Sequence, residues 1–287
     1  GVTSLVYAAL LLRPAVAAPY KTAHSTTPEL ASGDHPPRRG WSGVLHDVRL
    51  AWRGTELGRG TLVGFWTHQA TMASGTVLAM VWGFPYLTEG LGYSADRAAG
   101  VLSVFVLGTL VFSFIVGPLT GRHPGWRMPI AIGTCLAGIV ALGGLAVWPG
   151  GPPPAAAVIG AFFILSAGSP ASQIGFHLAR DYNPRARIST ATGLVNVGGF
   201  SAAMAGAVIV GIILDNLSGH ATPGLADYRW ALAALALMTA LSTTALIISL
   251  LRLRKVALVR IAAGEEVALP VVAHWWDGAV HHAERNE

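Results

Sequence analysis

Four imidazole or amide side chains, His68, Gln69, Gln173 and Asn196, interrupt long apolar stretches of the sequence. An imidazole takes up or releases a proton near physiological pH, and amides donate and accept hydrogen bonds. Because polar groups are costly to place in an apolar medium, each of the four is a candidate for a site that binds a polar solute. The alternative is that they join neighbouring helices, at roughly 0.6 kcal/mol per hydrogen bond in membrane proteins.

The stretches that hold these side chains have the length and composition of membrane-spanning helices. Hydrophobic residues make up 53% of the 287 residues and charged residues only 11%, whereas soluble domains carry about 25% charge. At a rise of ~1.5 Å per residue, about 20 apolar residues cross the hydrocarbon of a bilayer. The sequence predicts six such helices, at approximately 62–87, 98–120, 128–148, 155–179, 188–214 and 229–251.

The predicted helices bring the four polar side chains to a similar depth. Consecutive helices run in opposite directions, so the first and fifth begin, and the fourth ends, at the same membrane face. His68 and Gln69 then lie about 9–11 Å from that face, Gln173 about 9 Å and Asn196 about 12 Å. We expect a layer of hydrogen-bonding groups below the midplane, where a substrate-binding site is plausible. Interhelical hydrogen bonding is the competing interpretation.

The basic residues indicate which face this is. Most of the 19 lysines and arginines lie in alternate loops, and the intervening loops hold only Arg97 and Arg229. Basic loops of membrane proteins face the cytoplasm. The sequence therefore predicts a multi-pass protein of the plasma membrane with a cytoplasmic C-terminus. The net charge of +5 follows from these loops, and no nucleic-acid partner is expected.

The two ends of the chain differ from the apolar region between them. We interpret residues 1–17 as the end of a truncated transmembrane helix, although a signal peptide is the alternative. Residues 18–60 are predicted to form a cytoplasmic loop. Its segment 41–57 is expected to be an amphipathic helix, either on the inner leaflet or packed as a soluble linker. The bundle is predicted over 61–256 and a cytoplasmic tail over 257–287.

The motifs of common enzyme chemistry are missing from the sequence. It holds one cysteine, Cys135, and no HExxH, GxSxG or P-loop pattern. The tail histidines have no metal-ligand spacing. The sequence therefore predicts no catalytic residue, no metal site and no cofactor, and a polytopic membrane enzyme is the less favoured class.

Three segments carry a resemblance to a known family. Residues 117–127, GPLTGRHPGWR, resemble the second copy of the glycine-and-arginine loop motif of the major facilitator superfamily, with Gly121 where the family usually has an acid. Residues 187–200, RISTATGLVNVGGF, are similar to the start of that family's eleventh helix, and residues 87–99 to its outer loop after the seventh. The resemblance implies an all-α membrane protein, a six-transmembrane-helix bundle that forms the C-terminal half of the family's fold. It also implies a gating loop with Gly117, Arg122 and Arg127.

The function that the resemblance implies is transport of a small solute by a secondary carrier working through alternating access, either proton-coupled or facilitative. The expected partners are the lipid bilayer, a small-molecule solute and a missing N-terminal six-helix half. His68 and Asn196, with Gln69 and Gln173, are the expected substrate-binding residues, and protonation of His68 is the candidate for coupling. A non-transporting membrane scaffold or receptor is the main alternative.

Overall fold

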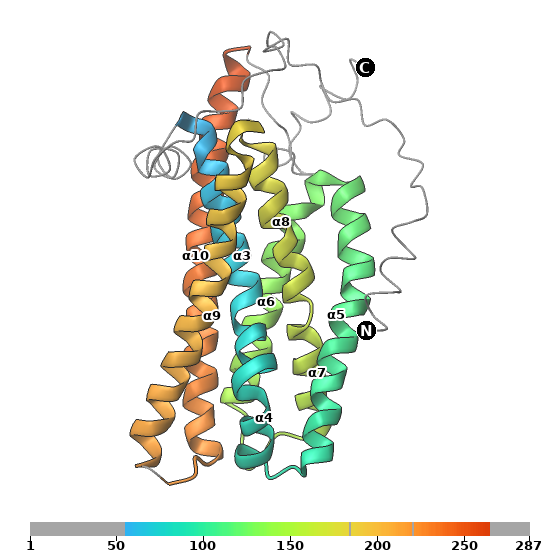
Figure 1. The fold of residues 1–287 in the computed structure, drawn as a ribbon, viewed down its shortest axis with the longest axis vertical. Helices are drawn as coiled ribbons and strands as arrows, with labels where there is room; N and C mark the ends of the chain where they lie inside the picture. The colour runs from blue at the N-terminus through green and yellow to red at the C-terminus, as the bar shows by residue number, and fades with distance from the viewer. Residues whose placement is uncertain (1–54, 184, 220, 265–287) are drawn as a thin grey trace. The chain divides into compact units, whose positions relative to one another are not determined.

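The computed structural model describes residues 55–183, 185–219 and 221–264. Within these ranges all regular structure is helical (Figure 1), which confirms the predicted all-α class. The helices are α3 (Thr55–Val77), the π-helical η1 (Leu78–Trp82), α4 (Gly83–Pro85), the π-helical η2 (Tyr86–Gly90), α5 (Ala95–Arg122), the 3₁₀ turn η3 (Pro124–Trp126), α6 (Arg127–Ala146), α7 (Ala155–Leu165), α8 (Gly168–Asp181), the 3₁₀ turn η4 (Arg185–Arg187), α9 (Ile188–Ser218) and α10 (Leu225–Ala262).

These elements form six helical rods that correspond to the six predicted helices. The first rod runs from α3 through η2, and the fourth is divided into α7 and α8 at residues 166–167. The last rod, α10, is longer than the predicted 229–251 at both of its ends. Of the predicted end segments, 1–17 lies outside the described residues. So do most of the loop 18–60, the amphipathic helix 41–57 up to residue 54, and the tail from 265 onwards.

Five of the rods in the described chain are long and apolar enough to cross a membrane: α5, α6 with η3, α7 with α8, α9 and α10. The first rod is not among them, because α3 carries hydroxyl, imidazole and amide side chains over more than two turns. Several of these polar residues are buried, namely Thr61, Thr67, His68, Thr71 and Ser74. A helix enclosed by its neighbours can remain in a bilayer with polar groups, provided that they find partners inside the bundle.

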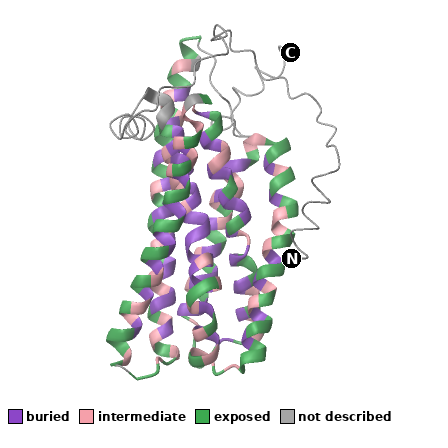
Figure 2. Ribbon diagram, viewed as in Figure 1, coloured by how far each residue is buried: buried purple, intermediate pink, exposed green. Residues whose placement is uncertain are grey.

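The first rod lies at the centre of the bundle. Its main helix, α3, packs most extensively against α9, α8 and α10, whereas α5 lies at the edge, next to α7 and α8 (Figure 1). Figure 2 shows buried residues along the interior and exposed residues on the outer faces of α5 and α9. Large apolar side chains are exposed on those outer faces, including Val106, Phe114, Phe200 and Met204.

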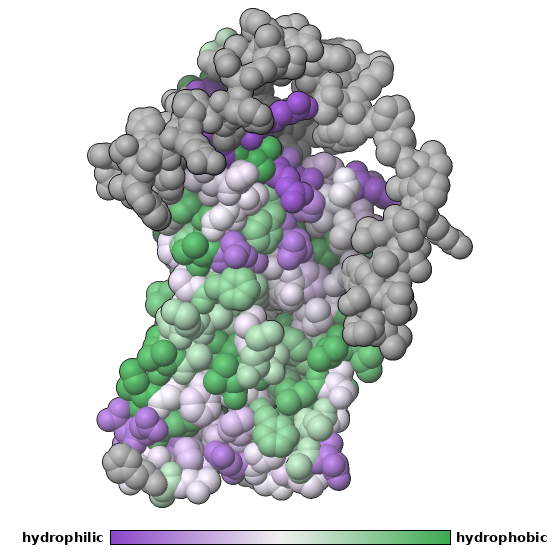
Figure 3. Space-filling model, in the orientation of Figure 1, coloured by the Kyte–Doolittle hydropathy of each residue, from purple (hydrophilic) through white to green (hydrophobic). Residues whose placement is uncertain are grey.

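Hydrophobic residues form a band across the middle of the face shown in Figure 3, with hydrophilic residues towards its two ends. This distribution fits a bundle surrounded by hydrocarbon at its middle and by water at its ends. One end carries Arg122 at the end of α5, Arg127 at the start of α6 and Arg180 near the end of α8, and is called the arginine end below. The opposite end carries the loops that follow η2, α6 and α9.

Glycines allow α3 to approach α8 closely. A Cβ added at Gly64 would lie 2.6 Å from the carbonyl oxygen of Gly175, and one added at Gly175 would lie 2.6 Å from that of Gly64. The two helices therefore meet backbone to backbone, as helices in membranes do where small residues face each other. This contact fixes the distance between α3 and α8, and it lies about one helical turn before His68 on α3.

We predict that Gly175→Ala destabilises the bundle, although alanine is the better helix former. The new methyl group must displace the backbone of α3, and such overpacking costs about 1–3 kcal/mol of unfolding free energy. The matched control is Gly133→Ala on α6, where an added Cβ meets nothing within 4 Å. Thermal unfolding of both purified variants in detergent measures the difference. Equal stability of the two variants would contradict the close contact.

Candidate functional site

The structure places His68 in the interior of the bundle. Its side chain is 2% exposed. The Nδ1 atom lies 3.3 Å from the carbonyl oxygen of Ser172 on α8, and the ring meets the Phe176 ring edge to face, with centroids 4.8 Å apart. The other ring nitrogen, Nε2, is buried and has no hydrogen-bond partner in the described chain. His68 therefore offers one unused polar atom inside the bundle.

Gly199 of α9 lies directly against the imidazole of His68. A Cβ added at this glycine would lie 2.4 Å from Cδ2 of His68 and 2.7 Å from its Nε2. The adjacent Gly198 is in similarly close contact with Phe65, whose ring an added Cβ would meet at 2.8 Å. Only a residue without a side chain allows α9 to cover the imidazole in this way.

Gln69 points to a different helix from His68. Its Nε2 donates a hydrogen bond of 2.9 Å to the hydroxyl oxygen of Ser242 on α10. One and a half turns further along α3, the hydroxyl oxygens of Ser74 and Thr239 form a second hydrogen bond to α10, 2.5 Å long. These contacts join α3 to α10, which is the interhelical role that the sequence left open for such residues.

Gln173 and Asn196 are exposed on α8 and α9. Neither forms a hydrogen bond to His68 or Gln69 within the described chain. They are nevertheless close to the buried histidine along their own helices, since Gln173 follows Ser172 and Asn196 precedes Gly199 by three residues. The four predicted site residues therefore lie on three adjoining helices, with His68 buried, Gln69 half-buried, and Gln173 and Asn196 exposed.

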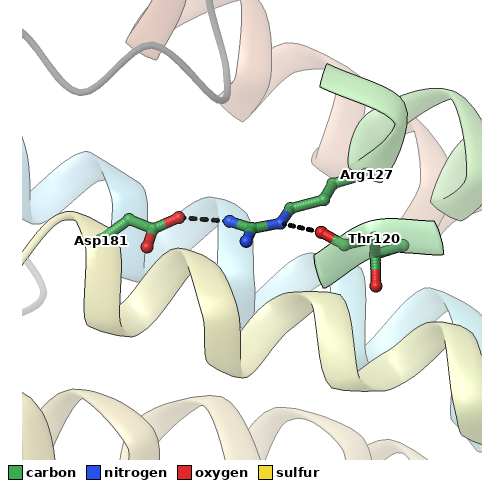
Figure 4. Close-up of polar contacts among 3 residues, drawn as sticks. All are labelled: Thr120, Arg127 and Asp181. Atoms are coloured by element: carbon green, nitrogen blue, oxygen red, sulfur yellow. Dashed lines mark hydrogen bonds and ion pairs between the residues drawn. The ribbon is translucent and has the colours of Figure 1, made fainter. Parts of the chain in front are cut away.

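The arginine loop is tied to the end of α8 through Arg127. This residue is only 7% exposed. Its Nη1 forms an ion pair with Asp181, and its Nε donates a 3.1 Å hydrogen bond to the carbonyl oxygen of Thr120 near the end of α5. Figure 4 shows the guanidinium between these two partners. The other two predicted loop residues, Gly117 and Arg122, are exposed.

A second set of polar contacts lies at the opposite end, around the start of α10. The hydroxyl of Tyr228 donates a 2.7 Å hydrogen bond to Oε2 of Glu89 at the end of the first rod. Next to it, Nη2 of Arg229 donates to three carbonyl oxygens after α6, at 2.8 Å from Trp148, 2.9 Å from Gly151 and 3.2 Å from Gly150. Cationic side chains stabilise the carbonyl end of a helix in this manner.

Sequence reasoning missed the partners of these residues. Asp181 could have been predicted as the partner of an arginine, because it is the only acidic residue in the sequence between positions 98 and 214. The sequence gives no indication that Ser172 and Ser242 are partners of the predicted site residues, since a hydroxyl or a backbone carbonyl in an apolar helix does not reveal which neighbouring helix it contacts. Among the described residues no group of His, Cys, Asp and Glu side chains could hold a metal ion.

We predict that Arg127 and Asp181 are energetically coupled. Arg127→Gln should lower the unfolding free energy by about 1–3 kcal/mol, because the carboxylate loses a charge-assisted hydrogen bond. Arg122→Gln, in the same loop but exposed, should change it by less than about 0.5 kcal/mol. A double-mutant cycle with Asp181→Asn, followed by thermal unfolding, gives the coupling. Strictly additive effects of the two substitutions would contradict the ion pair.

Comparison with known proteins agrees with this arrangement. The family profile described as "Major Facilitator Superfamily" matches residues 65–278, which is more than half of the chain. No curated protein and no solved structure matches the chain significantly. The match includes the predicted site residues and the ion pair of Arg127 with Asp181. The chain belongs to the Major Facilitator Superfamily of multi-pass membrane transporters.

Proposed function

We propose that this chain is one six-helix half of a secondary carrier that moves a small polar solute by alternating access. A second, N-terminal six-helix half completes the carrier. Membership in the superfamily supports transport as the function. The arginine end faces the cytoplasm in this proposal, because basic loops are retained on the cytoplasmic side, and the membrane that holds the carrier is the plasma membrane.

The exposed amides of Gln173 and Asn196 carry this proposal. Each lies eight residues from the arginine end of its helix, α8 or α9, and therefore about 12 Å into the bundle. An amide exposed to lipid at this depth would leave its donors and acceptor without partners. The side of α8 and α9 that holds these amides is therefore covered by the second half or lines a water-filled cavity. Phe200 and Met204 continue the exposed stripe of Asn196 along α9 and lie on this same covered side.

The solute binds on this face rather than within the half. A cavity of about 10 Å³ lies inside the described bundle, beside Ser74 and Thr239. This volume suits one water molecule and no solute. A site between two halves places the solute against exposed polar groups, and Asn196 and Gln173 supply both donors and acceptors there.

His68 and the arginine loop have supporting roles in this proposal. His68 takes up the proton that drives solute movement, since it is the titratable side chain in the middle of α3. Gln69 keeps α3 attached to α10 through Ser242. The ion pair of Arg127 with Asp181 joins the loop between α5 and α6 to α8. These helices then move as one body when the halves rock against each other.

We predict that Asn196→Ala in the full-length carrier raises the solute concentration for half-maximal uptake roughly 5- to 150-fold, because a lost hydrogen bond leaves about 1–3 kcal/mol uncompensated. Asn216→Ala is the matched control on the same helix, since Asn216 lies at the opposite end and its amide donates to the carbonyl oxygen of Ile212. Uptake of a panel of labelled solutes into proteoliposomes measures both variants.

Unchanged uptake in Asn196→Ala would remove this residue from the solute site. Absence of uptake for every solute by the unmodified carrier would instead favour a non-transporting scaffold or receptor. The control separates these cases from misfolding, because Asn216→Ala retains the stability and the uptake of the parent protein.

A further inference from the structure

We propose that Nε2 of His68 is a proton-binding site sealed by Gly199, and that it takes up its proton only when α9 moves away from α3. Acidification then shifts the bundle towards the separated arrangement of these two helices. This inference deepens the proposed function and rests on it, because it assigns the coupling proton to one atom and one helix contact. Four features of the surroundings of His68 support it.

The first feature is the hydrogen-bonding state of the ring. Ser172 offers His68 a carbonyl oxygen, which only accepts hydrogen bonds, so Nδ1 carries the ring hydrogen and donates it. Nε2 is then a bare acceptor, buried and without a partner in the described chain. Nearly all buried polar groups in native proteins have a partner, so an orphaned acceptor requires an explanation, and a ligand that binds in another state provides one.

The second feature is the lack of space beside Nε2. Gly199 covers this atom so closely that an added Cβ would lie 2.7 Å away. Phe176 covers the ring from α8, and an added Cβ on Gly175 would lie 3.3 Å from the Cβ of His68. Neither a solute nor a water molecule fits between the imidazole and α9. Of the ligands that bind imidazole, a proton alone requires no volume.

The third feature is that the packed pocket does not stabilise a charged ring. A proton on Nε2 would create a second N–H donor, and the described chain holds no hydrogen-bond partner for this atom. On α8, His177 directly follows Phe176, whose ring contacts the imidazole, but a histidine carries no negative charge that could act as a counter-ion. The remaining charged side chains described on these three helices lie towards helix ends: Arg59, Arg180, Asp181 and Asp215.

A buried cation without a counter-ion or acceptor costs several kcal/mol. Protonation therefore favours any arrangement that brings water to Nε2, and separation of α9 from α3 does so. The step is a simple equilibrium in which one proton from water binds the lone pair of Nε2 and the ring gains one positive charge. Low pH favours the separated helices, and high pH favours the contact with Gly199.

The fourth feature connects this site with the solute. Asn196 lies three residues before Gly199, hence nearly one turn away on the same helix. A movement of α9 that releases His68 also displaces Asn196, which is exposed on the proposed solute-binding face. The two ligands are thus linked through one rigid element that has a packed and a separated position.

Hydrogen–deuterium exchange of peptides from α9 tests the inference, with the full-length carrier in lipid nanodiscs at pH 5.5 and 7.5. The non-titrating variant His68→Gln is measured beside the parent at each pH, so that the chemical exchange rate cancels. We expect the parent to lose protection in α9 on acidification, by up to about tenfold per pH unit for one linked proton. His68→Gln should show no such loss. His68→Leu provides a second non-titrating variant if the glutamine is poorly folded.

Two control variants identify the atoms involved. Gly199→Ala forces the ring away from α9 and should lower the protection of α9 already at pH 7.5. Gly193→Ala on the same helix should leave it unchanged, because an added Cβ there meets nothing within 4 Å. His177→Gln should retain the pH response of the parent.

The possible outcomes separate this inference from the proposed function. An α9 response to pH that is the same in the parent, His68→Gln and His68→Leu would overturn the inference, even if the carrier transports its solute normally. A response that disappears in the His68 variants would support the inference, even if no solute is transported and the carrier assignment fails. A response abolished by His177→Gln but not by the His68 variants would move the proton to α8 and overturn the proposal.

Discussion

Hydrocarbon offers no hydrogen-bond partners, so each polar group of a spanning helix must find its partner within the protein, and the arrangement of this bundle depends on that constraint. The first rod is the most polar, and it occupies the centre with neighbours on several sides. Serine, threonine and glutamine side chains of α3 bond to α10 or to their own helix, and Thr61 accepts a hydrogen bond from Asn183, which follows α8. The more apolar rods surround α3 and expose their large side chains outward. His68 departs from this pattern, because only one of its two nitrogens has a partner.

Charges are used sparingly and mostly at the ends of the rods. At the arginine end, Arg127 joins the end of α5 to that of α8 through Thr120 and Asp181. At the opposite end, Arg229 binds the carbonyl oxygens that follow α6. Each of these guanidinium groups connects elements that are distant in sequence. Besides a core of large apolar side chains, the middle of the bundle holds contacts between small residues and a few neutral hydrogen bonds, each of which is weak.

The sequence predicted the six rods well, because hydropathy and length report directly on a membrane environment. It placed the polar residues at a common depth but could not say where they point. His68 and Gln69 are adjacent in sequence, yet successive residues on a helix are turned by about 100°, so one meets α8 and the other α10. The division of the fourth rod at Ser166 also escaped prediction, since a local change in hydrogen bonding leaves hydropathy unaltered. Nor does an apolar pattern reveal that a histidine will lie against the backbone of Gly199.

The hydrogen bonds between α3 and α10 have a consequence for the synthesis of the protein and its insertion into the membrane. A ribosome makes the first rod before the others, and the last rod, which supplies Ser242 and Thr239, emerges some 170 residues later than Gln69 and Ser74. The most polar helix, α3, is thus synthesised long before α10, the helix that supplies its hydrogen-bond partners. Until α10 is made, the polar side chains of α3 must find hydrogen-bond partners in the insertion machinery or in water. Packing of α10 then allows α3 to enter the lipid fully.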